Sequence, residues 1–266
     1  MPKIEIHYKR VSADKTKYGE EAHSFNSLTQ KEFESFNPSV LGLGDVSREG
    51  SYVQALAAFY DLEGFTDFCN QVDSHLVIPE FLQRFIDWLF RKLADAFKEG
   101  CDGNRVTIWG ALPFYTKFLG DGILFLWDTT YCRHLVDMLN VIYILHEISE
   151  GYQADFLPNI KKHVSKPPQR LRCGVARGQI ISVGDGSDYV GSCINIAARL
   201  QKLSQLTFAF SRRGLDISNE PDSKFLKQFV LRRVELRGIG SEELVYVKQN
   251  ELRRLSPSER KLFRTL

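Results

Sequence analysis

Apolar residues are continuous in some parts of the chain and recur at helical spacing in others. The nearly unbroken apolar run at residues 53–61 predicts a strand that is buried on both faces. Apolar side chains at helical spacing over residues 81–97, with Pro79 in a first turn, predict an amphipathic helix. Residues 135–148 and 193–203 predict two further helices.

Other apolar segments have the extended pattern of strands. A tight turn at residues 120–122 separates two of them and predicts a hairpin with an acidic tip. The predicted strands are 105–112, 114–119, 123–127, the pair 171–175 and 179–183, and the closing strands 229–236 and 244–247. Strands interleaved with helices and hairpins, without repeated βαβ units, predict an α+β fold with a mostly antiparallel sheet.

The length of 266 residues and the hydrophobic content of 43% suit one main globular domain with additions. Residues 1–50 are polar and turn-rich and are expected to form an N-terminal extension that packs on the domain or binds a partner. We expect the main domain at residues 51–250 and a C-terminal helix or tail at residues 251–266. A loop with Pro158, Pro167 and Pro168 is expected between two of its elements.

Charge and cysteine content exclude several classes of function. The 35 Lys and Arg residues nearly balance the 33 Asp and Glu residues, so no nucleic-acid partner is expected. Neither a membrane-spanning apolar run nor a signal-peptide pattern is present, and a soluble, cytoplasmic protein without a membrane partner is expected. The cysteines are odd in number and lack metal-type spacing, which favours reduced thiols at Cys69, Cys101, Cys132, Cys173 and Cys193.

Two acidic stretches each place one aspartate at the turn after an apolar run. Residues 59–66 contain Asp61, and residues 117–122 contain Asp121. Either motif alone has an explanation in turn chemistry. Together, two carboxylates on neighbouring strands can hold two divalent cations that activate an oxygen nucleophile against a phosphate. Residues 64–66 open a helix, where free backbone N–H groups suit phosphate oxygens.

Two further stretches, residues 171–178 and 188–199, complete an ordered set of four. In order and local spacing, the set resembles the catalytic domain of the class III nucleotidyl cyclases. The resemblance implies a ferredoxin-like core with additions. It also implies conversion of a ribonucleoside triphosphate to its 3′,5′-cyclic monophosphate and pyrophosphate, with two Mn²⁺ or Mg²⁺ ions per site.

The resemblance gives each matched residue a role. The metal ligands are Asp61, Asp121 and the main-chain carbonyl of Leu62; the substrate-binding residues are Phe65, Thr66, Lys117, Arg172 and Asp188; the catalytic residues are Asn195 and Arg199. In this family the asparagine orients the ribose, and the last arginine stabilises charge on the α-phosphate. Electrostatic donors of that kind are worth about 10²-fold or more in rate.

The chain departs from the family pattern near its C-terminus and in one insertion. Ile239 occupies the position of a phosphate-binding lysine of some mammalian members, and Arg237 is a candidate substitute. The excess length relative to those members falls at residues 101–113.

Family members build each pocket from two subunits, and this chain carries both halves of the residue set. That predicts a head-to-tail homodimer with two equivalent sites. One copy supplies Asp61, Asp121 and Arg172, and the other supplies Lys117, Asp188, Asn195 and Arg199.

The identity of the base rests on two residues and on a second resemblance. Lys117 and Asp188 match the positions that contact adenine in adenylate cyclases, but they suit uracil equally well, because Asp188 can accept from N3–H while Lys117 donates to a ring carbonyl. The local sequence of four segments resembles the pyrimidine cyclases of bacterial Pycsar anti-phage systems. The segments are residues 72–75, 88–90, 111–114 and 125–128. Those cyclases make cyclic UMP or cyclic CMP for a separate effector protein. We predict UTP as substrate and a role in anti-phage defence, with an adenylate cyclase using ATP, or a cytidylate cyclase, as alternatives.

Two other classes of protein fit less well. A catalytically inactive binding module would usually have lost Asp61, Asp121 or Arg199, and all three are present. A diguanylate cyclase carries a Gly-Gly-Asp/Glu-Glu-Phe signature, which residues 120–123 do not match.

Overall fold

The computed structural model describes residues 7, 9–12, 24–130, 135–203, 205–215, 217 and 224–266. The chain divides into two compact units: Met1–Ser51 with Ile181–Tyr189, and Tyr52–Ile180 with Val190–Leu266. The predicted domain limits at residues 50 and 250 stay a prediction.

The first unit contains an antiparallel pair of strands, β1 (Lys9–Ser12) and β2 (Ser24–Ser27). Next come the short helix α2 (Gln30–Ser35) and a 3₁₀-helix, η1 (Pro38–Leu41). A reciprocal capping box starts α2, because the side chains of Thr29 and Glu32 each accept from the backbone N–H of the other.

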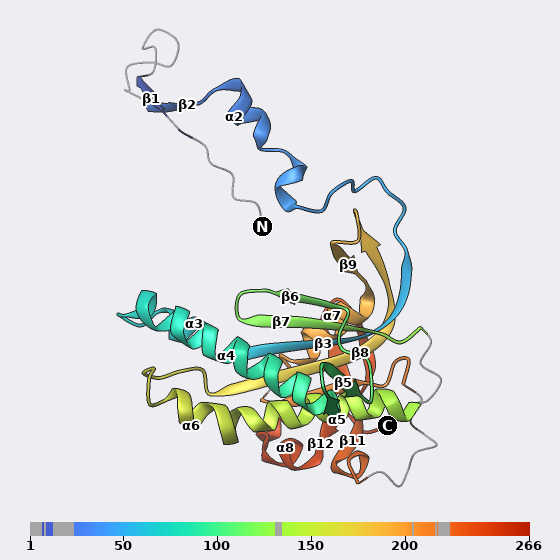
Figure 1. The fold of residues 1–266 in the computed structure, drawn as a ribbon. Helices are drawn as coiled ribbons and strands as arrows, with labels where there is room; N and C mark the ends of the chain where they lie inside the picture. The colour runs from blue at the N-terminus through green and yellow to red at the C-terminus, as the bar shows by residue number, and fades with distance from the viewer. Residues whose placement is uncertain are drawn as a thin grey trace. The chain divides into compact units, whose positions relative to one another are not determined.

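The second unit is built on a sheet whose strands run in the order β11-β12-β10-β8-β3-β7-β6 (Figure 1). The end of β8, from Ile181, and most of β9, which pairs with β8, belong to the first unit. The strands are β3 (Tyr52–Glu63), β6 (Tyr115–Phe118), β7 (Gly122–Asp128), β8 (Arg170–Val183), β9 (Asp188–Val190), β10 (Phe208–Ser211), β11 (Phe229–Leu236) and β12 (Gly240–Lys248). The pairs β3–β7, β6–β7, β10–β12 and β11–β12 are antiparallel, and the pair β8–β10 is parallel. The predicted α+β, mostly antiparallel fold is confirmed.

Helices occupy most of the connections in this unit. They are α3 (Phe65–Cys69), α4 (Ser74–Phe97), α5 (Leu135–Gly151), the π-helix η2 (Tyr152–Phe156), α6 (Leu157–Ile160), α7 (Ser192–Leu200), the 3₁₀-helix η3 (Leu226–Gln228), α8 (Gln249–Arg254) and α9 (Pro257–Arg260). The segment β3-α4-β6-β7-α5-β8 is a βαββαβ unit whose sheet order is fourth, first, third, second, the ferredoxin-like arrangement.

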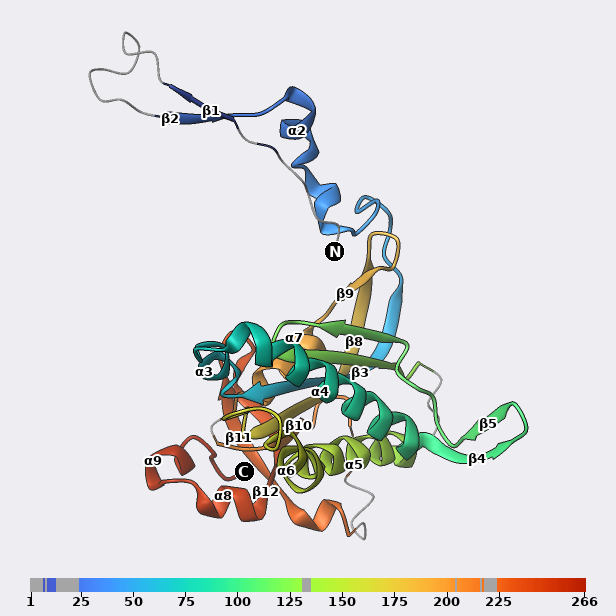
Figure 2. The same cartoon turned by 60° about the vertical axis from the view of Figure 1, so that its left-hand side comes forward.

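The sheet has helices on both faces. Leu56, Tyr60 and Leu62 of β3 share one hydrophobic core with the buried faces of α4 and α5, which lie side by side in Figures 1 and 2. The Tyr60 hydroxyl donates to the carbonyl of Leu145 at 2.8 Å and ties the strand to α5. On the opposite face, a Cβ at Gly174 would lie 2.2 Å from the carbonyl oxygen of Ala197, so β8 and α7 approach closely there.

Four local predictions were wrong in detail. Pro158, expected in a loop, lies in the helix α6. The predicted pair 171–175 and 179–183 is one continuous strand, β8, because Gly178 lies inside the strand instead of making a turn. Pro79 lies within α4 and not in its first turn, since the helix begins at Ser74. The predicted strand 105–112 is short, and it pairs outside the main sheet.

That short strand is β5 (Arg105–Ile108), which pairs with β4 (Lys98–Asp102) to form a separate ribbon. Every side chain of β5 is exposed, and Figure 2 shows the ribbon extending beyond the end of α4. The inserted residues 101–113 therefore supply no strand of the main sheet. The predicted hairpin 114–127 is confirmed as β6 and β7.

Candidate functional site

The two predicted metal-binding aspartates lie on adjacent chain segments at one end of the sheet. Asp61 is near the end of β3, opposite Gly122 of β7, and Asp121 is in the turn just before β7. The backbone N–H of Leu62 donates to the carbonyl of Asp121 at 3.0 Å and links the segments directly. Gly120 has φ +90°, a conformation that glycine adopts without steric cost. The turn at Gly120–Gly122 and the pairing of β3 with β7 thus place both aspartates at the same end of the sheet.

Asp61 is a buried carboxylate held in an ion pair. Its residue is 2% exposed, and Nη2 of Arg172 donates to its Oδ2 at 2.6 Å. Burial raises the pKa of Asp61 above its ordinary value, while the bond to Arg172 opposes that shift. The negative charge of Asp121 raises the same pKa further, and the positive charge of Lys202 lowers it.

Glu63 and Arg170 form a second ion pair one step further along the two strands. The guanidinium of Arg170 donates to both carboxylate oxygens of Glu63, and its Nη1 donates to the carbonyl of Gln205 at 2.9 Å. Nη1 of Arg172 lies 3.7 Å from Glu63 Oε1, so Arg172 contacts both carboxylates, and the two acids of β3 face the two arginines of β8. The pairing of 61 with 172 and of 63 with 170 shows that the two strands are antiparallel.

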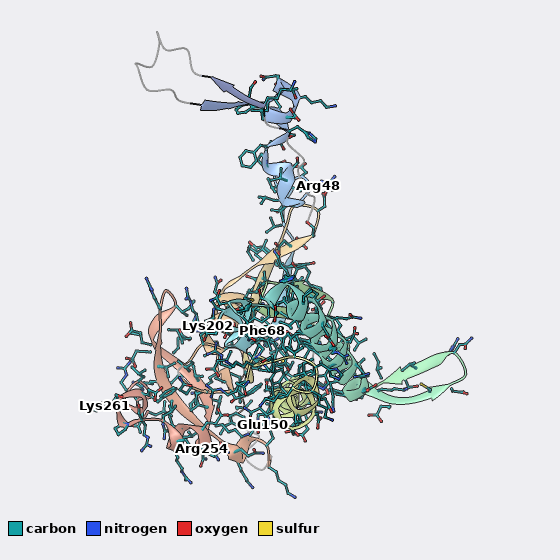
Figure 3. The ribbon with its side chains drawn as sticks, turned by 90° about the vertical axis from the view of Figure 1, so that its left-hand side faces the viewer. Arg48, Phe68, Glu150, Lys202, Arg254 and Lys261 are labelled. Carbon is teal, nitrogen blue, oxygen red and sulfur yellow. The ribbon has the colours of Figure 1, made fainter. Side chains whose placement is uncertain are left out.

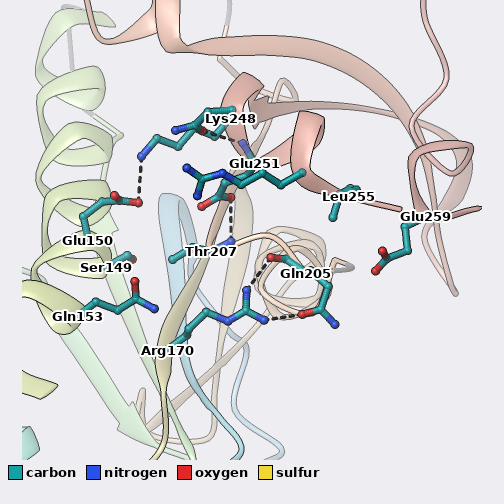
Figure 4. Close-up of a pocket in the computed structure, with 12 residues that line it drawn as sticks. Ser149, Glu150, Gln153, Arg170, Gln205, Thr207, Lys248, Glu251, Leu255 and Glu259 are labelled. Carbon is teal, nitrogen blue, oxygen red and sulfur yellow. Dashed lines mark hydrogen bonds and ion pairs between the residues drawn. The ribbon is translucent and has the colours of Figure 1, made fainter. Parts of the chain in front are cut away.

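Arg170 also lines a polar pocket of about 350 Å³, drawn in Figure 4. Across this pocket, Lys248 pairs with Glu150 at 2.9 Å, and Glu251 accepts from the backbone N–H of Thr207 at 2.9 Å. The charged groups of the pocket are therefore largely paired within the chain.

The sequence analysis gave no role to Glu63, Arg170 or Lys202, although the alternation of strand side chains places Glu63 on the same face as Asp61. The alternation of β8 offered a signal for Arg170, because Arg170 and Arg172 must share a face. Lys202, labelled in Figure 3, follows α7 and approaches Asp61 only through tertiary packing. No local pattern could have indicated it.

The ion pairs among Asp61, Glu63, Arg170 and Arg172 form a charge network, and removing Arg170 should lower the stability of the protein. Arg170→Met should lower the free energy of unfolding by about 1–3 kcal/mol, because it leaves the half-buried Glu63 without its main partner. Chemical denaturation would measure the loss. Adding Glu63→Gln should recover part of it, since the unpaired charge is then gone. Arg84→Met, which breaks the exposed pair with Glu80, is the control and should cost less than about 0.5 kcal/mol. Equal losses of unfolding free energy for Arg170→Met and Arg84→Met would show that the charge network does not stabilise the fold more than an exposed ion pair does.

The donor set suits hard divalent cations. Asp61, Asp121 and the carbonyl of Leu62 are all oxygen donors, the type that Mg²⁺ and Mn²⁺ prefer. Within the described residues, no group of three or more His, Cys, Asp or Glu side chains is arranged to hold a metal. A cation at Asp61 would therefore need main-chain and substrate oxygens to complete its coordination, which fits the predicted two-carboxylate site.

The predicted phosphate-binding turn lies directly after β3. Gly64, with φ +84°, precedes α3, and its carbonyl accepts from the N–H of Phe68. Phe65 is half-buried against the ring of Phe68, while Thr66 is exposed. Thr66 is thus open to solvent at the start of the helix, and the phosphate-binding role of Phe65 and Thr66 stays a prediction.

Asn195 and Arg199 lie on the exposed side of α7. They are one helical turn apart, while the buried residues of α7 are Cys193, Ile196, Ala197 and Leu200. Across the part of the chain that the structure describes, neither side chain has a hydrogen bond or ion pair. Both polar groups are therefore available to an external ligand or a second subunit.

The residues predicted to contact the base belong to different units. Lys117 is half-buried in β6 and, through the register of β6 with β7 and β3, points from the same sheet face as Asp61. Asp188 begins β9 in the first unit, where its Oδ1 accepts from the N–H of Tyr189 at 2.9 Å. Their shared role in base recognition stays a prediction.

Two other predictions concern the C-terminal hairpin and the thiols. Arg237 is exposed in the turn after β11, and Ile239 is half-buried with its N–H bonded to the carbonyl of Leu236.

Free thiols are found at Cys69, Cys101, Cys173 and Cys193, whereas Cys132 lies outside the described residues.

Comparison with protein-family models and with curated proteins finds no match to this sequence. Solved structures with a similar fold include the adenylyl cyclase CyaB from P. aeruginosa, at a TM-score of 0.56 and 13% identity, covering 79% of this chain and 100% of that one. The guanylyl cyclase Cya2 is similar at 0.54 and 15%, covering 76% and 94%. An adenylate/guanylate cyclase/hydrolase from Silicibacter pomeroyi is similar at 0.50 and 18%, covering 75% and 98%.

The chain therefore has the fold of the class III adenylyl and guanylyl cyclase domains, as the sequence resemblance implied. Among the described residues, no helix is both long enough and apolar enough to span a bilayer.

Proposed function

We propose that this protein is a nucleotidyl cyclase that converts a ribonucleoside triphosphate to its 3′,5′-cyclic monophosphate. The observation that carries the proposal is the junction of β3 and β7. There Leu62 is bonded to Asp121, and the buried Asp61 lies close to Asp121 within a cyclase fold. In the reaction the ribose 3′-oxygen bonds to the α-phosphorus, the bond to the β-phosphate breaks, pyrophosphate leaves and the hydroxyl proton passes to solvent.

The residues of the site would have separate roles in binding the metal ions and the triphosphate. When bound, Mg²⁺ or Mn²⁺ supplies positive charge that acidifies the 3′-hydroxyl and neutralises the triphosphate. Asp61, Asp121 and the Leu62 carbonyl would hold the ions. The guanidinium of Arg172 would turn from Asp61 toward a triphosphate oxygen, because bound cations would replace it as the positive partner of that carboxylate.

The opposite side of the pocket would come from α7 and β6 of a second copy. Asn195 would orient the ribose, and Arg199 would donate to oxygens of the α-phosphate as negative charge builds on them. The exposure of both side chains on α7 supports this assignment. The functional unit is then a head-to-tail homodimer with two equivalent pockets.

UTP is the proposed substrate, and cyclic UMP the product. Lys117 and Asp188 supply one donor and one acceptor, which suit the O4 and N3–H edge of uracil. The texture shared with pyrimidine cyclases supports an anti-phage role in which a separate effector protein reads the product. The second candidate is an adenylate cyclase, favoured by the match of the same two residues to adenine-contacting positions.

One experiment tests both the reaction and the base. Purified protein is incubated with Mn²⁺ and equal concentrations of UTP, CTP, ATP and GTP, and the products are separated by chromatography. Cyclic UMP as the main product supports the full proposal. Dominant cyclic AMP or cyclic CMP would retain the cyclase and replace the base. No cyclic product from any triphosphate, with the protein folded and dimeric, would reject the cyclase itself.

A further inference from the structure

Three arginines line one hollow near the C-terminus, and none of its lining residues is assigned to the cyclase site. The hollow has a volume of about 270 Å³ and lies among β11, α8 and α9. It is lined by Val230, Arg232, Gln249, Leu252, Arg253 and Arg260. This lining set contains three cations and no carboxylate.

Neighbouring arginines are neutralised within the chain, but these three are not. Arg233 and Arg264 both pair with the carboxylate of Glu242, at 3.4 and 2.8 Å. In contrast, over the residues that the structure describes, none of the three lining arginines contacts a carboxylate. The carboxylate of Glu242 thus pairs with Arg233 and Arg264 and with none of the three lining arginines.

The contacts that the three lining arginines do make use main-chain carbonyls and leave other donors available. Nη1 of Arg232 donates to the carbonyl of Leu231 at 2.9 Å, and Nη2 of Arg260 donates to the carbonyls of Arg253 and Leu255 at 2.7 and 3.1 Å. Arg253 makes no side-chain hydrogen bond or ion pair within the described chain. Each guanidinium carries five N–H donors, so most of those around the hollow lack a protein acceptor.

The chemistry of the hollow selects its ligand. Guanidinium groups bind phosphate oxygens through two parallel hydrogen bonds, and three cations close together repel one another unless an anion lies between them. A volume of about 270 Å³ is just below the range of about 300–1,000 Å³ that holds drug-sized ligands. We propose that this hollow is a binding site for a small phosphate anion, the size of inorganic phosphate or pyrophosphate. The inference does not depend on the proposed cyclase activity.

Calorimetric titration of the full chain with inorganic phosphate, and separately with pyrophosphate, tests the site. Metal-free, low-salt buffer is used so that the two-carboxylate site does not contribute. Arg253→Gln and Arg232→Gln should each weaken binding about tenfold, which corresponds to losing one charged hydrogen-bonded contact. Arg254→Gln is the matched control, because Arg254 is the next residue on α8, is labelled in Figure 3 and does not line this hollow. It should leave the affinity within about twofold.

Several outcomes would overturn the site. Absence of binding at millimolar phosphate would do so, as would equal weakening by Arg253→Gln and Arg254→Gln, which would indicate diffuse surface attraction. Sedimentation with phosphatidylglycerol vesicles distinguishes a lipid source of the same chemistry. Vesicle binding that is lost in Arg253→Gln, without binding of either free anion, would replace the small ligand with a membrane surface. Thermal melting checks that each variant is folded, and Arg253 is exposed, so its replacement should leave the fold intact.

Discussion

Asp121→Asn is expected to reduce cyclisation by at least about 10²-fold at saturating Mn²⁺, because an amide is a far weaker metal ligand than a carboxylate and carries no charge. The substitution should leave the fold intact. The carbonyl that accepts from Leu62 belongs to the main chain, and Asn tolerates the same turn. Steady-state assays across a Mn²⁺ titration would measure kcat and the concentration of metal required.

Asp67→Asn is the matched control for this prediction. Asp67 lies on α3, six residues from Asp61, and is exposed to solvent. If the effect of Asp121 were a general loss of negative charge near the site, Asp67→Asn would also reduce turnover. We expect a change of less than about twofold for this exposed group. Full turnover of Asp121→Asn at saturating Mn²⁺ would refute the two-metal site.

The sequence predicted the elements whose signal is local. An unbroken apolar run defined β3, helical spacing defined α4 and α5, and the glycines beside Asp121 defined the hairpin. These segments position Asp61 and Asp121, so the position of the two carboxylates followed from the order of the strands. The antiparallel sheet followed from the same interleaving of strands and helices.

The errors arose where tertiary contacts override local preference. Gly178 indicated a turn, yet it continues β8, where a Cβ would come within 3.2 Å of Cys193 Cβ on α7. The space therefore requires a small residue, for a reason that only the packing of α7 reveals. The pairing of β5 with β4 could not be predicted from the sequence either. Every β5 side chain is exposed, so no buried apolar face indicates the sheet to which the strand belongs.

The charge network shows the same limit within the site. Strand alternation alone places Glu63 on the face of Asp61, but its partner Arg170 is 107 residues away and is determined by the register of β3 against β8. A shift of that register by one residue would move both arginines to the opposite face. The identity of the pairs therefore depends on the assembled sheet.

The second prediction with a large effect concerns pockets shared between two chains. Mixing inactive Asp121→Asn protein with inactive Arg199→Ala protein should restore about a quarter of wild-type activity after subunit exchange, because half of the dimers are then mixed and each has one intact pocket. Arg199→Ala should fold normally, since Arg199 is exposed on α7 and the buried residues of that helix are unchanged. Activity is measured against the ratio of the two proteins and should be maximal at equal amounts.

A mixture of Asp61→Asn with Asp121→Asn is the control, because it tests whether two changes in the same half of the pocket can also complement each other. Both changes affect the metal-binding half, so every pocket of that mixed dimer lacks one carboxylate and activity should stay at background. Exchange is verified with differently tagged chains in both mixtures. If the first mixture stays inactive although mixed dimers are isolated, Arg199 does not act across a subunit boundary and each chain must hold a complete site. Rescue in both mixtures would show that the two aspartates act in different pockets, which contradicts their direct main-chain link through Leu62.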